Sequence, residues 1–483
     1  IRMRFATEAV RRVRETCGRE FIIIYRLSML DLVEEGSDWN EVEMLAQRIE
    51  QAGASIINTG IGWHEARIPT IATMVPRAAF SWVTQKLMGK VGIPLITTNR
   101  INDPDVAEKI LAEGCADMVS MARPFLADPA FVEKAAQGRA DEINTCIGCN
   151  QACLDQIFAG EVTSCLVNPR ACRETQLPVI RAQVPKRLAV VGSGPAGLAF
   201  ATTAASRGHH VTLFDAHNEI GGQFNVAKQI PGKEEFYQTL RYYSRQLTLL
   251  GVTLRLGETV GASQLTGYDE VILACGISPR LPDIAGIDHP CVLTYLDVLR
   301  DKKPVGQRVA IIGAGGIGFD TAEYLIHNGP SSSLSAQAFS HEWGIDQSLT
   351  HRGGLAPSGP QPEPAARDIV LLQRKTTKVG AGLGKTTGWI HRASLLQRGV
   401  KMQSGVSYER IDDAGLHLIM NGQPVCLEVD NVIICAGQEP QRALYQPLQA
   451  AGKTVHLIGG ADIAVELDAR RAIDQGTRLA LNI

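Results

Sequence analysis

Residues 186–216 read KRLAVVGSGPAGLAFATTAASRGHHVTLFDA, and this stretch decides the fold. It contains an apolar run, the glycine loop Gly192-Ser-Gly194-Pro-Ala-Gly197, an alanine-rich helical segment and a second apolar run that ends at Asp215. Strand, glycine turn, helix and strand in this order are typical of a dinucleotide-binding unit, whose helix N-terminus faces the phosphates. We therefore predict a dinucleotide site here, with Asp215 accepting a hydrogen bond from a ribose hydroxyl. The alternative is a glycine turn in a sheet that binds no nucleotide.

The same pattern begins again near residue 306, with the second loop Gly313-Ala-Gly315-Gly-Ile-Gly318. Here the next apolar run ends in Arg374 and Lys375, with no acidic residue. Cationic groups at this point accommodate a 2′-phosphate, which favours NADPH over NADH. The alternative is a solvated strand end, since exposed charges need no special role. The Pro-, Gly- and Ser-rich residues 330–364 interrupt this copy, and we expect a long surface loop there, with a lid as one role.

Four strand–helix units precede these loops in residues 1–140. Four units are half of a (β/α)8 barrel, and a barrel places its chemistry at the C-terminal ends of its strands. An open four-stranded sheet is the alternative. Because the chain opens with Ile and not Met, we expect a barrel whose first half is missing from this chain, and activity of this piece alone stays open. The expected buried strands are Phe21–Leu27, Ser55–Gly60, Ile93–Arg100 and Ala116–Pro124.

The loop after the second of these strands carries Trp63 and His64. A histidine at the C-terminal end of a barrel strand can donate a proton near neutral pH, so His64 is the candidate catalytic residue, with a purely structural histidine as the alternative. We expect Arg26, Arg100 and Arg123 at the ends of the neighbouring strands. Since the last loops of such barrels commonly form a phosphate site, these three cations predict bound flavin mononucleotide (FMN).

Four of the eleven cysteines lie between the barrel units and the first glycine loop. Cys146, Cys149, Cys153 and Cys165 follow the pattern CxxC, three residues, C, eleven residues, C. Four thiolates at this spacing can surround one [4Fe–4S] cluster. A structural zinc site also takes four cysteines, and the spacing alone does not separate the two. The flanking dinucleotide fold favours iron–sulfur, because zinc carries no electrons.

Composition excludes several classes of protein. The 483 residues have 48 Lys plus Arg and 50 Asp plus Glu, and this balance gives no support to a nucleic-acid or membrane-surface protein. No uninterrupted apolar stretch reaches the ~18 residues needed to span a bilayer. The charged opening IRMRFATEAVRRVRE is no secretory signal, and the odd cysteine count argues against a complete disulfide framework. We expect the reducing cytosol as the compartment, and the oligomeric state stays open, a monomer included.

Two glycine loops in tandem, with ACG and CAG turns at residues 274–276 and 435–437, resemble the flavoprotein disulfide reductases over residues 187–483. The resemblance implies FAD at the first loop and NADPH at the second. It also implies that Asp462, in a Gly-Ala-Asp segment before a helix, contacts the flavin ribityl or phosphate, with Ala196 and Gln223 beside the same flavin. The redox-active CxxxxC of that family is absent, because residues 219–223 contain no cysteine. Electrons must therefore leave this FAD by another route.

The complete order resembles the bacterial NADPH-dependent 2,4-dienoyl-CoA reductases of the old yellow enzyme barrel group. The specific pieces are HEAR (64–67), CIGCNQAC (146–153) and VGSGPAG (191–197). The implied fold is an α/β chain with the C-terminal half of a TIM barrel, a [4Fe–4S] segment and two Rossmann-like domains. FMN would lie in the barrel, with Arg26 near the electron-rich end of its ring and its phosphate on Arg100, Ala122 and Arg123. The implied domains are residues 1–140 for FMN and substrate, 141–172 for the cluster, 183–284 with 426–483 for FAD, and 285–425 for NADPH.

The implied activity is reduction of 2,4-dienoyl-CoA to enoyl-CoA in the β-oxidation of unsaturated fatty acids. Electrons would pass from NADPH to FAD, to the cluster, to FMN and to the unsaturated acyl-CoA. His64, Glu65, Ala66 and Arg67 would lie at the substrate, and His64 would act with a tyrosine that cannot be assigned in this chain. Three alternatives stay open. They are a 2-enoate reductase, an amine dehydrogenase of the same architecture, and a non-catalytic subunit that supplies electrons from NADPH through FAD and the cluster to a partner.

Overall fold

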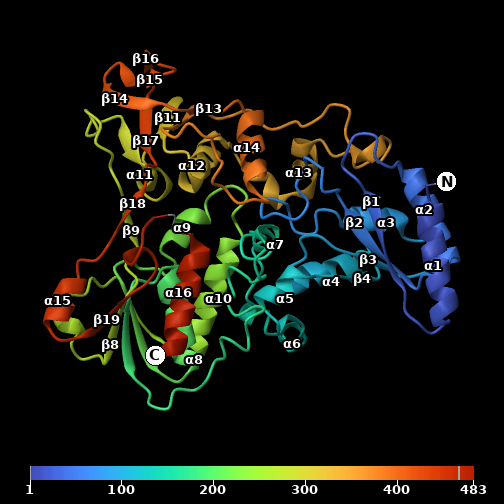
Figure 1. Cartoon of the computed structure of the whole chain (residues 1–483), viewed down its shortest axis with the longest axis horizontal. Helices are drawn as coiled ribbons and strands as arrows, with labels where there is room; N and C mark the ends of the chain where they lie inside the picture. Colours follow the sequence, from blue (N-terminus) through green and yellow to red (C-terminus); the bar gives the residue numbers. More distant parts are fainter. Residues whose placement is uncertain (1, 466–467) are drawn as a thin grey trace. The chain divides into compact units, whose positions relative to one another are not determined.

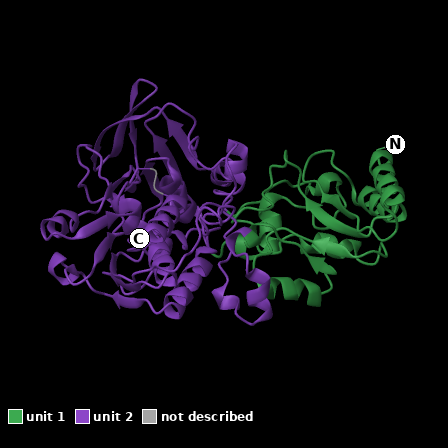
Figure 2. Ribbon diagram, turned by 60° about the horizontal axis from the view of Figure 1, so that its bottom comes forward, with its two compact units in different colours: residues 1–125, 329–363 green, residues 126–328, 364–483 purple. Residues whose placement is uncertain are grey.

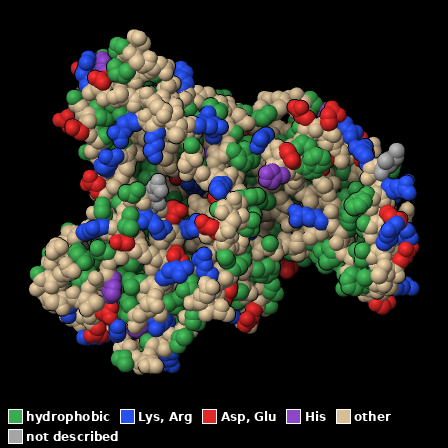
Figure 3. All heavy atoms as spheres, in the orientation of Figure 1, with side chains coloured by type: hydrophobic (Ala, Val, Ile, Leu, Met, Phe, Trp, Pro, Cys, Tyr) green, Lys and Arg blue, Asp and Glu red, His purple; other side chains and the backbone are tan. Residues whose placement is uncertain are grey.

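The computed structural model describes residues 2–465 and 468–483, and the chain divides into two compact units (Figure 2). Unit 1 comprises residues 1–125 and 329–363, and unit 2 comprises residues 126–328 and 364–483. The segment 329–363 therefore belongs to unit 1, although the residues before and after it belong to unit 2. None of the described helices is both long enough and apolar enough to cross a bilayer. On the face drawn in Figure 3, acidic and basic side chains are interspersed.

Unit 1 contains a parallel sheet of four strands in the consecutive order β1-β2-β3-β4, which confirms the predicted strand–helix units. Four strands do not close, so the complete (β/α)8 barrel stays a prediction. The strands are β1 (Ile24–Leu30), β2 (Ile56–Ile61), β3 (Leu95–Thr97) and β4 (Met118–Val119). The helices in and just after unit 1's first segment are α1 (Arg4–Cys17), α2 (Trp39–Gln51), α3 (Ser81–Leu87), α4 (Pro104–Ala112) and α5 (Arg123–Ala127).

Capping residues fix the starts of two of these helices. Asp38 accepts a hydrogen bond from the Glu41 N–H at 2.9 Å, and the Glu41 side chain accepts from the Asp38 N–H in return. Asp103 caps α4 in the same position, directly before a proline. The first strand extends beyond its predicted end at Leu27. Exposed and buried side chains continue to alternate there, with Ser28 exposed and Met29 buried. As a result Arg26 lies inside β1 and not at its C-terminal end, which corrects the prediction.

Residues 330–364 are not the surface loop that the composition predicted. They form the helix α13 (Ala336–Trp343) and bury Phe339 and Trp343 in unit 1, at 1% and 3% exposure. Phe80 packs edge-on against Phe339 with ring centroids 6.4 Å apart. Arg352 donates to Asp38 and Glu41 at the start of α2. The Pro, Gly and Ser content indicates turns, but the two buried aromatic side chains anchor this segment in the core of unit 1.

Unit 2 contains two parallel five-stranded sheets, as two Rossmann-like folds require (Figure 1). In the first, the order is β19-β8-β5-β6-β7, and in the second it is β10-β17-β11-β12-β13. The first sheet comprises β5 (Arg187–Val191), β6 (His210–Asp215), β7 (Thr253–Leu256), β8 (Glu270–Leu273) and β19 (Thr454–Leu457). The second comprises β10 (Val292–Thr294), β11 (Arg308–Ile312), β12 (Asp368–Gln373), β13 (Lys401–Ser404) and β17 (Asn431–Ile434).

Two small antiparallel sheets accompany these folds. The strands β9 (Ile277–Pro279) and β18 (Gln438–Pro440) pair with each other, and β14 (Ser407–Asp412), β15 (Gly415–Met420) and β16 (Gln423–Leu427) form a three-stranded sheet. The predicted domain bounds remain predictions, and one strand bears on them. The strand β17 pairs in the second sheet, although residues 426–483 were assigned to the FAD domain.

Helix α16 (Ala469–Asn482) packs tightly on α8 (Pro195–Ser206), and Figure 1 shows the two side by side. A Cβ on Gly476 would lie 2.3 Å from the carbonyl oxygen of Ala196, so only glycine permits this approach. The remaining helices of unit 2 are α6 (Phe131–Ala136), α7 (Leu154–Ala159), α9 (Gln223–Ala227), α10 (Phe236–Leu249), α11 (Tyr295–Leu299), α12 (Gly316–Ile326), α14 (Gly388–Gln397) and α15 (Tyr445–Ala450). Short 3-10 turns span Ala140–Glu142, Ala262–Leu265, Ser332–Leu334, Arg352–Gly354 and Gly459–Ala461.

Candidate functional site

The first glycine loop joins β5 to α8 and leaves space at the helix N-terminus. Gly192 has a φ of +107°, and its Cβ would lie 2.3 Å from the Ala274 carbonyl oxygen. A Cβ on Gly197 would lie 1.9 Å from the Gly192 carbonyl oxygen. By contrast, a Cβ on Gly194 would meet only the Gly222 Cα, at 4.0 Å. Gly192 and Gly197 are therefore required by close packing, whereas Gly194 leaves the backbone open where a pyrophosphate would approach.

Asp215 lies at the end of β6, as predicted, and is bonded to the glycine loop. Its Oδ2 accepts hydrogen bonds from the Ser193 N–H and hydroxyl, both at 2.7 Å, and its Oδ1 accepts from the His217 N–H at 2.8 Å. Burial opposes ionisation, but these hydrogen bonds outweigh it and hold the pKa of Asp215 below its usual value. The carboxylate is thus an ionised acceptor at neutral pH, as a ribose-binding role requires.

Other predicted flavin residues converge on the start of α8. The backbones of Gly194 and Gly222 face each other, which places Gln223, the first residue of α9, beside the loop. Ala196 faces Gly459, whose Cβ would lie 2.8 Å from the alanine methyl.

Asp462 is held in place by Gln475, a residue that sequence analysis missed. Gln475 lies on α16, donates to the Asp462 carboxylate at 2.7 Å and accepts from the Gly459 N–H at 2.7 Å. It therefore connects the turn that carries Asp462 to the last helix. No motif singled it out, because a lone glutamine on an amphipathic helix has an unremarkable pattern.

The second glycine loop repeats this geometry between β11 and α12. Gly313 has a φ of +111°, and its Cβ would lie 2.3 Å from the Cys435 carbonyl oxygen. A Cβ on Gly318 would lie 1.8 Å from the Gly313 carbonyl oxygen, whereas a Cβ on Gly315 would meet no atom within 4 Å. Arg374 and Lys375 are exposed directly after β12, which pairs in parallel with β11. Parallel neighbours end at one edge of the sheet, so these cations follow the edge that carries the loop.

In unit 1, the loop after β2 folds back on β1. The Trp63 N–H donates to the Asp31 carbonyl at 3.0 Å, and its indole donates to the Ser28 hydroxyl at 3.3 Å. His64 follows on this loop and is exposed. Arg26 stands opposite Asn58 in the register of β1 and β2. The structure therefore brings the predicted catalytic loop to the strand that carries Arg26.

The neighbours of His64 and the predicted phosphate ligands differ in exposure. Glu65 and Arg67 are exposed like His64, while Ala66 is buried. Arg100 is 5% exposed, and its Nε donates to the Val75 carbonyl at 2.9 Å. Ala122 is exposed, and Arg123 begins α5 half-buried.

The cysteine segment lies in unit 2, against the core of the first sheet. Cys146 belongs to that core, and Cys149 and Cys165 pack against it. Burial and the thiols of Cys146 and Cys149 raise the pKa of Cys165 well above its ordinary value, against hydrogen bonds from the Val167 and Asn168 amides. Three of the four predicted ligands are thus brought together. Within residues 2–465 and 468–483, no group of three or more His, Cys, Asp or Glu side chains is placed to hold a metal ion, so the cluster stays a prediction.

Both halves of the chain match known protein families. Residues 1–142 match the NADH:flavin oxidoreductase / NADH oxidase family, and residues 186–464 match the pyridine nucleotide-disulphide oxidoreductases. Residues 143–185, with the cysteines, lie between the two matches.

Individual proteins resemble almost the whole chain. A metal reductase of Desulforamulus reducens is 33% identical over 95% of this chain and 68% of its own length. A cinnamate reductase of Clostridium sporogenes is 27% identical over 95% of this chain and 66% of its own length. The solved structure of a 2-naphthoyl-CoA reductase with 2-naphthoyl-CoA superposes with a TM-score of 0.88 and 28% identity, over 100% of this chain and 68% of that one. The chain thus spans about two thirds of the length of these proteins.

Proposed function

This chain belongs to the pyridine nucleotide-disulphide oxidoreductase family, fused to a domain of the NADH:flavin oxidoreductase / NADH oxidase family, and on that premise we propose that it is an NADPH-dependent reductase of 2,4-dienoyl-CoA. The reaction adds a hydride and a proton across a conjugated diene thioester and gives an enoyl-CoA. The observation that carries the nucleotide-binding part of the proposal is the pair of glycine loops, in which a Cβ at position 194 or 315 would meet no atom closer than 4.0 Å.

Two of the relatives support an acyl group with a conjugated π system as the substrate. Cinnamate reductase and 2-naphthoyl-CoA reductase are named for substrates in which carbon–carbon π bonds are conjugated with a carbonyl. Hydride addition to such a system places charge on the carbonyl oxygen, which hydrogen-bond donors stabilise. The dienoyl thioester has the same electronic arrangement, and the HEAR loop at residues 64–67 is the sequence feature that favours it.

The proposal assigns residues to each nucleotide. FAD would be held by the first loop with Asp215, Gln223 and Asp462. NADPH would be held by the second loop, with its 2′-phosphate on Arg374 and Lys375. FMN would be held in unit 1 by Arg26 and by the residues around Arg100, Ala122 and Arg123.

The cysteine segment fits an iron–sulfur cluster in its donor set. Cys146, Cys149, Cys153 and Cys165 would be the ligands, and the cluster would carry single electrons between flavins. Amide N–H groups of Val167 and Asn168 point to the Cys165 sulfur, and such hydrogen bonds stabilise a thiolate ligand. Burial and the Cys146 and Cys149 thiols raise the pKa of Cys165, so a bound cation would favour the thiolate form of Cys165.

His64 would hold the proton that the substrate receives. Its loop is exposed, so a substrate can reach the ring, and the indole of Trp63 fixes the loop on Ser28. An imidazole is suited to this transfer near neutral pH.

An anaerobic titration of the purified chain tests the proposal. We expect NADPH to bleach the flavin absorbance, and a 2,4-dienoyl-CoA to restore it with one equivalent of enoyl-CoA formed. Replacing both Arg374 and Lys375 by Ala should weaken NADPH binding about 10-fold or more while leaving NADH binding unchanged. Bleaching by NADPH without reoxidation by any dienoyl-CoA would refute the substrate assignment.

A non-catalytic electron-supply subunit is the second candidate. The observation that favours it is that unit 2 contains both glycine loops and the cysteine segment. This candidate predicts NADPH oxidation with an artificial acceptor, but neither FMN in the purified chain nor reduction of dienoyl-CoA.

A further inference from the structure

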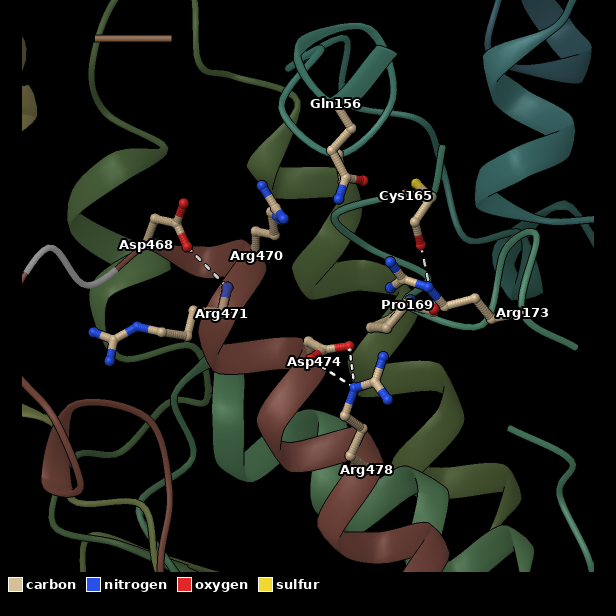
Figure 4. A pocket seen from close by; sticks show the side chains of 11 residues that line it. Gln156, Cys165, Pro169, Arg173, Asp468, Arg470, Arg471, Asp474 and Arg478 are labelled. Atoms are coloured by element: carbon tan, nitrogen blue, oxygen red, sulfur yellow. Dashed lines mark hydrogen bonds and ion pairs between the residues drawn. The ribbon is translucent and has the colours of Figure 1, made fainter. Parts of the chain in front are cut away.

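A cavity of about 450 Å³ in unit 2 lies between the cysteine segment and helix α16 (Figure 4). The cysteine segment contributes Gln156, Cys165 and Arg173 to its lining. Helix α16 contributes Arg470, Arg471 and Arg478. Arg470 and Arg478 lie on one face of the helix, because they are eight residues, or about two turns, apart. A cavity of this size lies within the range of about 300–1,000 Å³ that small-molecule sites occupy.

The arginines exceed the acids that line the cavity. Asp474 is paired with Arg478 at 2.8 Å, and Asp468 caps α16 by accepting from the Arg471 N–H at 2.8 Å. Arg470 forms an ion pair with the Glu161 carboxylate at 3.8 Å. In the described parts of the chain, the Arg173 guanidinium has no hydrogen bond or ion pair. The Arg173 guanidinium is thus available to an anion, and the Arg470 guanidinium is held by one long ion pair.

Gln156 supplies an acceptor at the same place. Its side chain is 3% exposed and is directed at the cavity in Figure 4. Its Nε2 donates to Glu161 at 3.1 Å, but its Oε1 is buried without a partner anywhere in residues 2–465 or 468–483. A buried carbonyl oxygen without a donor is unfavourable, and a ligand N–H would satisfy it.

We infer that this cavity binds a phosphorylated adenosine. Guanidinium groups bind phosphate oxygens in a bidentate manner, so Arg173 and Arg470 would hold the phosphate. The Gln156 carbonyl would accept from the amino group of the base. This ligand combines the anion and the donor that the lining requires, and either the nucleotide part of coenzyme A or a free adenine nucleotide supplies it. The inference does not rest on the dienoyl substrate.

The cavity is separate from the two glycine loops. On α16, Gln475 bonds to Asp462 and Gly459 of the predicted flavin site, whereas Arg470, Asp474 and Arg478 border the cavity. One helix therefore contacts both places, and a ligand in the cavity would order the helix that positions Asp462.

Calorimetric titration of the FAD-containing chain tests the inference, and the variants below separate binding in the cavity from binding at the second glycine loop. The titrants are ADP, coenzyme A and inorganic pyrophosphate. We expect Arg173→Ala and Arg470→Ala each to weaken ADP binding about tenfold. The matched control is Arg255→Ala on the exposed side of β7, which should leave binding unchanged. Gln156→Leu should weaken ADP but not pyrophosphate.

A second measurement needs no variant. ADP should protect Arg173 and Arg470 of the unmodified chain from phenylglyoxal, as read by peptide mass spectrometry. Tighter binding of coenzyme A than ADP would support the acyl carrier as the source, and equal binding would support a free nucleotide. Absence of both binding heat and protection, or equal weakening by the Arg255 control, would overturn the site. Equal effects of Gln156→Leu on ADP and pyrophosphate would overturn the assignment of the base.

Discussion

Gly313 and Gly315 are two residues apart in the second loop, and their surroundings are opposite. Gly313 has a φ of +111° and would place a Cβ 2.3 Å from a carbonyl oxygen, while Gly315 has no atom near its Cβ position. We expect Gly313→Ala to lower the free energy of unfolding by about 1–3 kcal/mol through backbone strain. We expect Gly315→Ala to change it by less than about 0.5 kcal/mol and still to weaken NADPH binding, since the methyl group occupies the space of the phosphates.

Denaturant unfolding and a fluorescence titration with NADPH separate these two effects. Each alanine is the control for the other, because the two substitutions add the same methyl group. Equal destabilisation by both, or unchanged NADPH affinity in Gly315→Ala, would contradict the assignment of the second loop.

Cys165 and Cys172 form a second matched pair of residues. Cys165 packs against the core beside two other thiols, whereas Cys172 is exposed. If the segment binds one [4Fe–4S] cluster, the chain contains about four iron atoms, and Cys165→Ser should remove them while Cys172→Ser should not. Iron and sulfide analysis with the visible spectrum measures this. Zinc in place of iron, or equal loss from both variants, would refute the cluster.

At the scale of elements, Asp346 organises the segment 329–363. Its carboxylate accepts from Ser348 and from the His351 N–H and ring. Burial alone would raise the pKa of Asp346, but these hydrogen bonds outweigh it and hold the pKa well below its ordinary value of 3.8. A group with a lowered folded pKa stabilises the fold fully above its unfolded pKa and loses that contribution as the pH falls through the folded pKa.

We therefore expect Asp346→Asn to cost about 1–3 kcal/mol at pH 7 and less as the pH falls below 3.8. Urea unfolding at pH 7, 4 and 3, followed by tryptophan fluorescence, measures the difference, since Trp343 is buried in this segment. If the loss in free energy of unfolding stays constant across these pH values, the charge of the Asp346 carboxylate contributes nothing to stability.

Sequence reasoning predicted elements where a local pattern determines them. Glycine loops and apolar runs act within a few residues, and these elements were found near their predicted positions. It failed where distant partners decide. Phe339 packs on a ring 259 positions earlier in the sequence, and this contact is not visible in a local window. Gln156 and Arg470 likewise come from segments far apart and meet only in the folded unit 2.

At the scale of the whole molecule, the two units divide the proposed reaction. Unit 2 holds both glycine loops, and unit 1 holds His64 and Arg26. The reduction of flavin by NADPH and the transfer to substrate are therefore separable by mutation. The segment 329–363 belongs to unit 1, although its neighbours in sequence belong to unit 2. The chain therefore passes between the units at residues 125, 328 and 363.

This division predicts the behaviour of His64→Ala. We expect the variant to reduce dienoyl-CoA about 100-fold more slowly, because general acid catalysis contributes at least that much, while NADPH oxidation by an artificial acceptor continues at the parent rate. The matched control is His210→Ala at the exposed start of β6, which should alter neither rate. Parallel assays with the two acceptors measure both. Loss of both activities would show that His64 maintains structure, and loss of neither would move the proton donor to another residue.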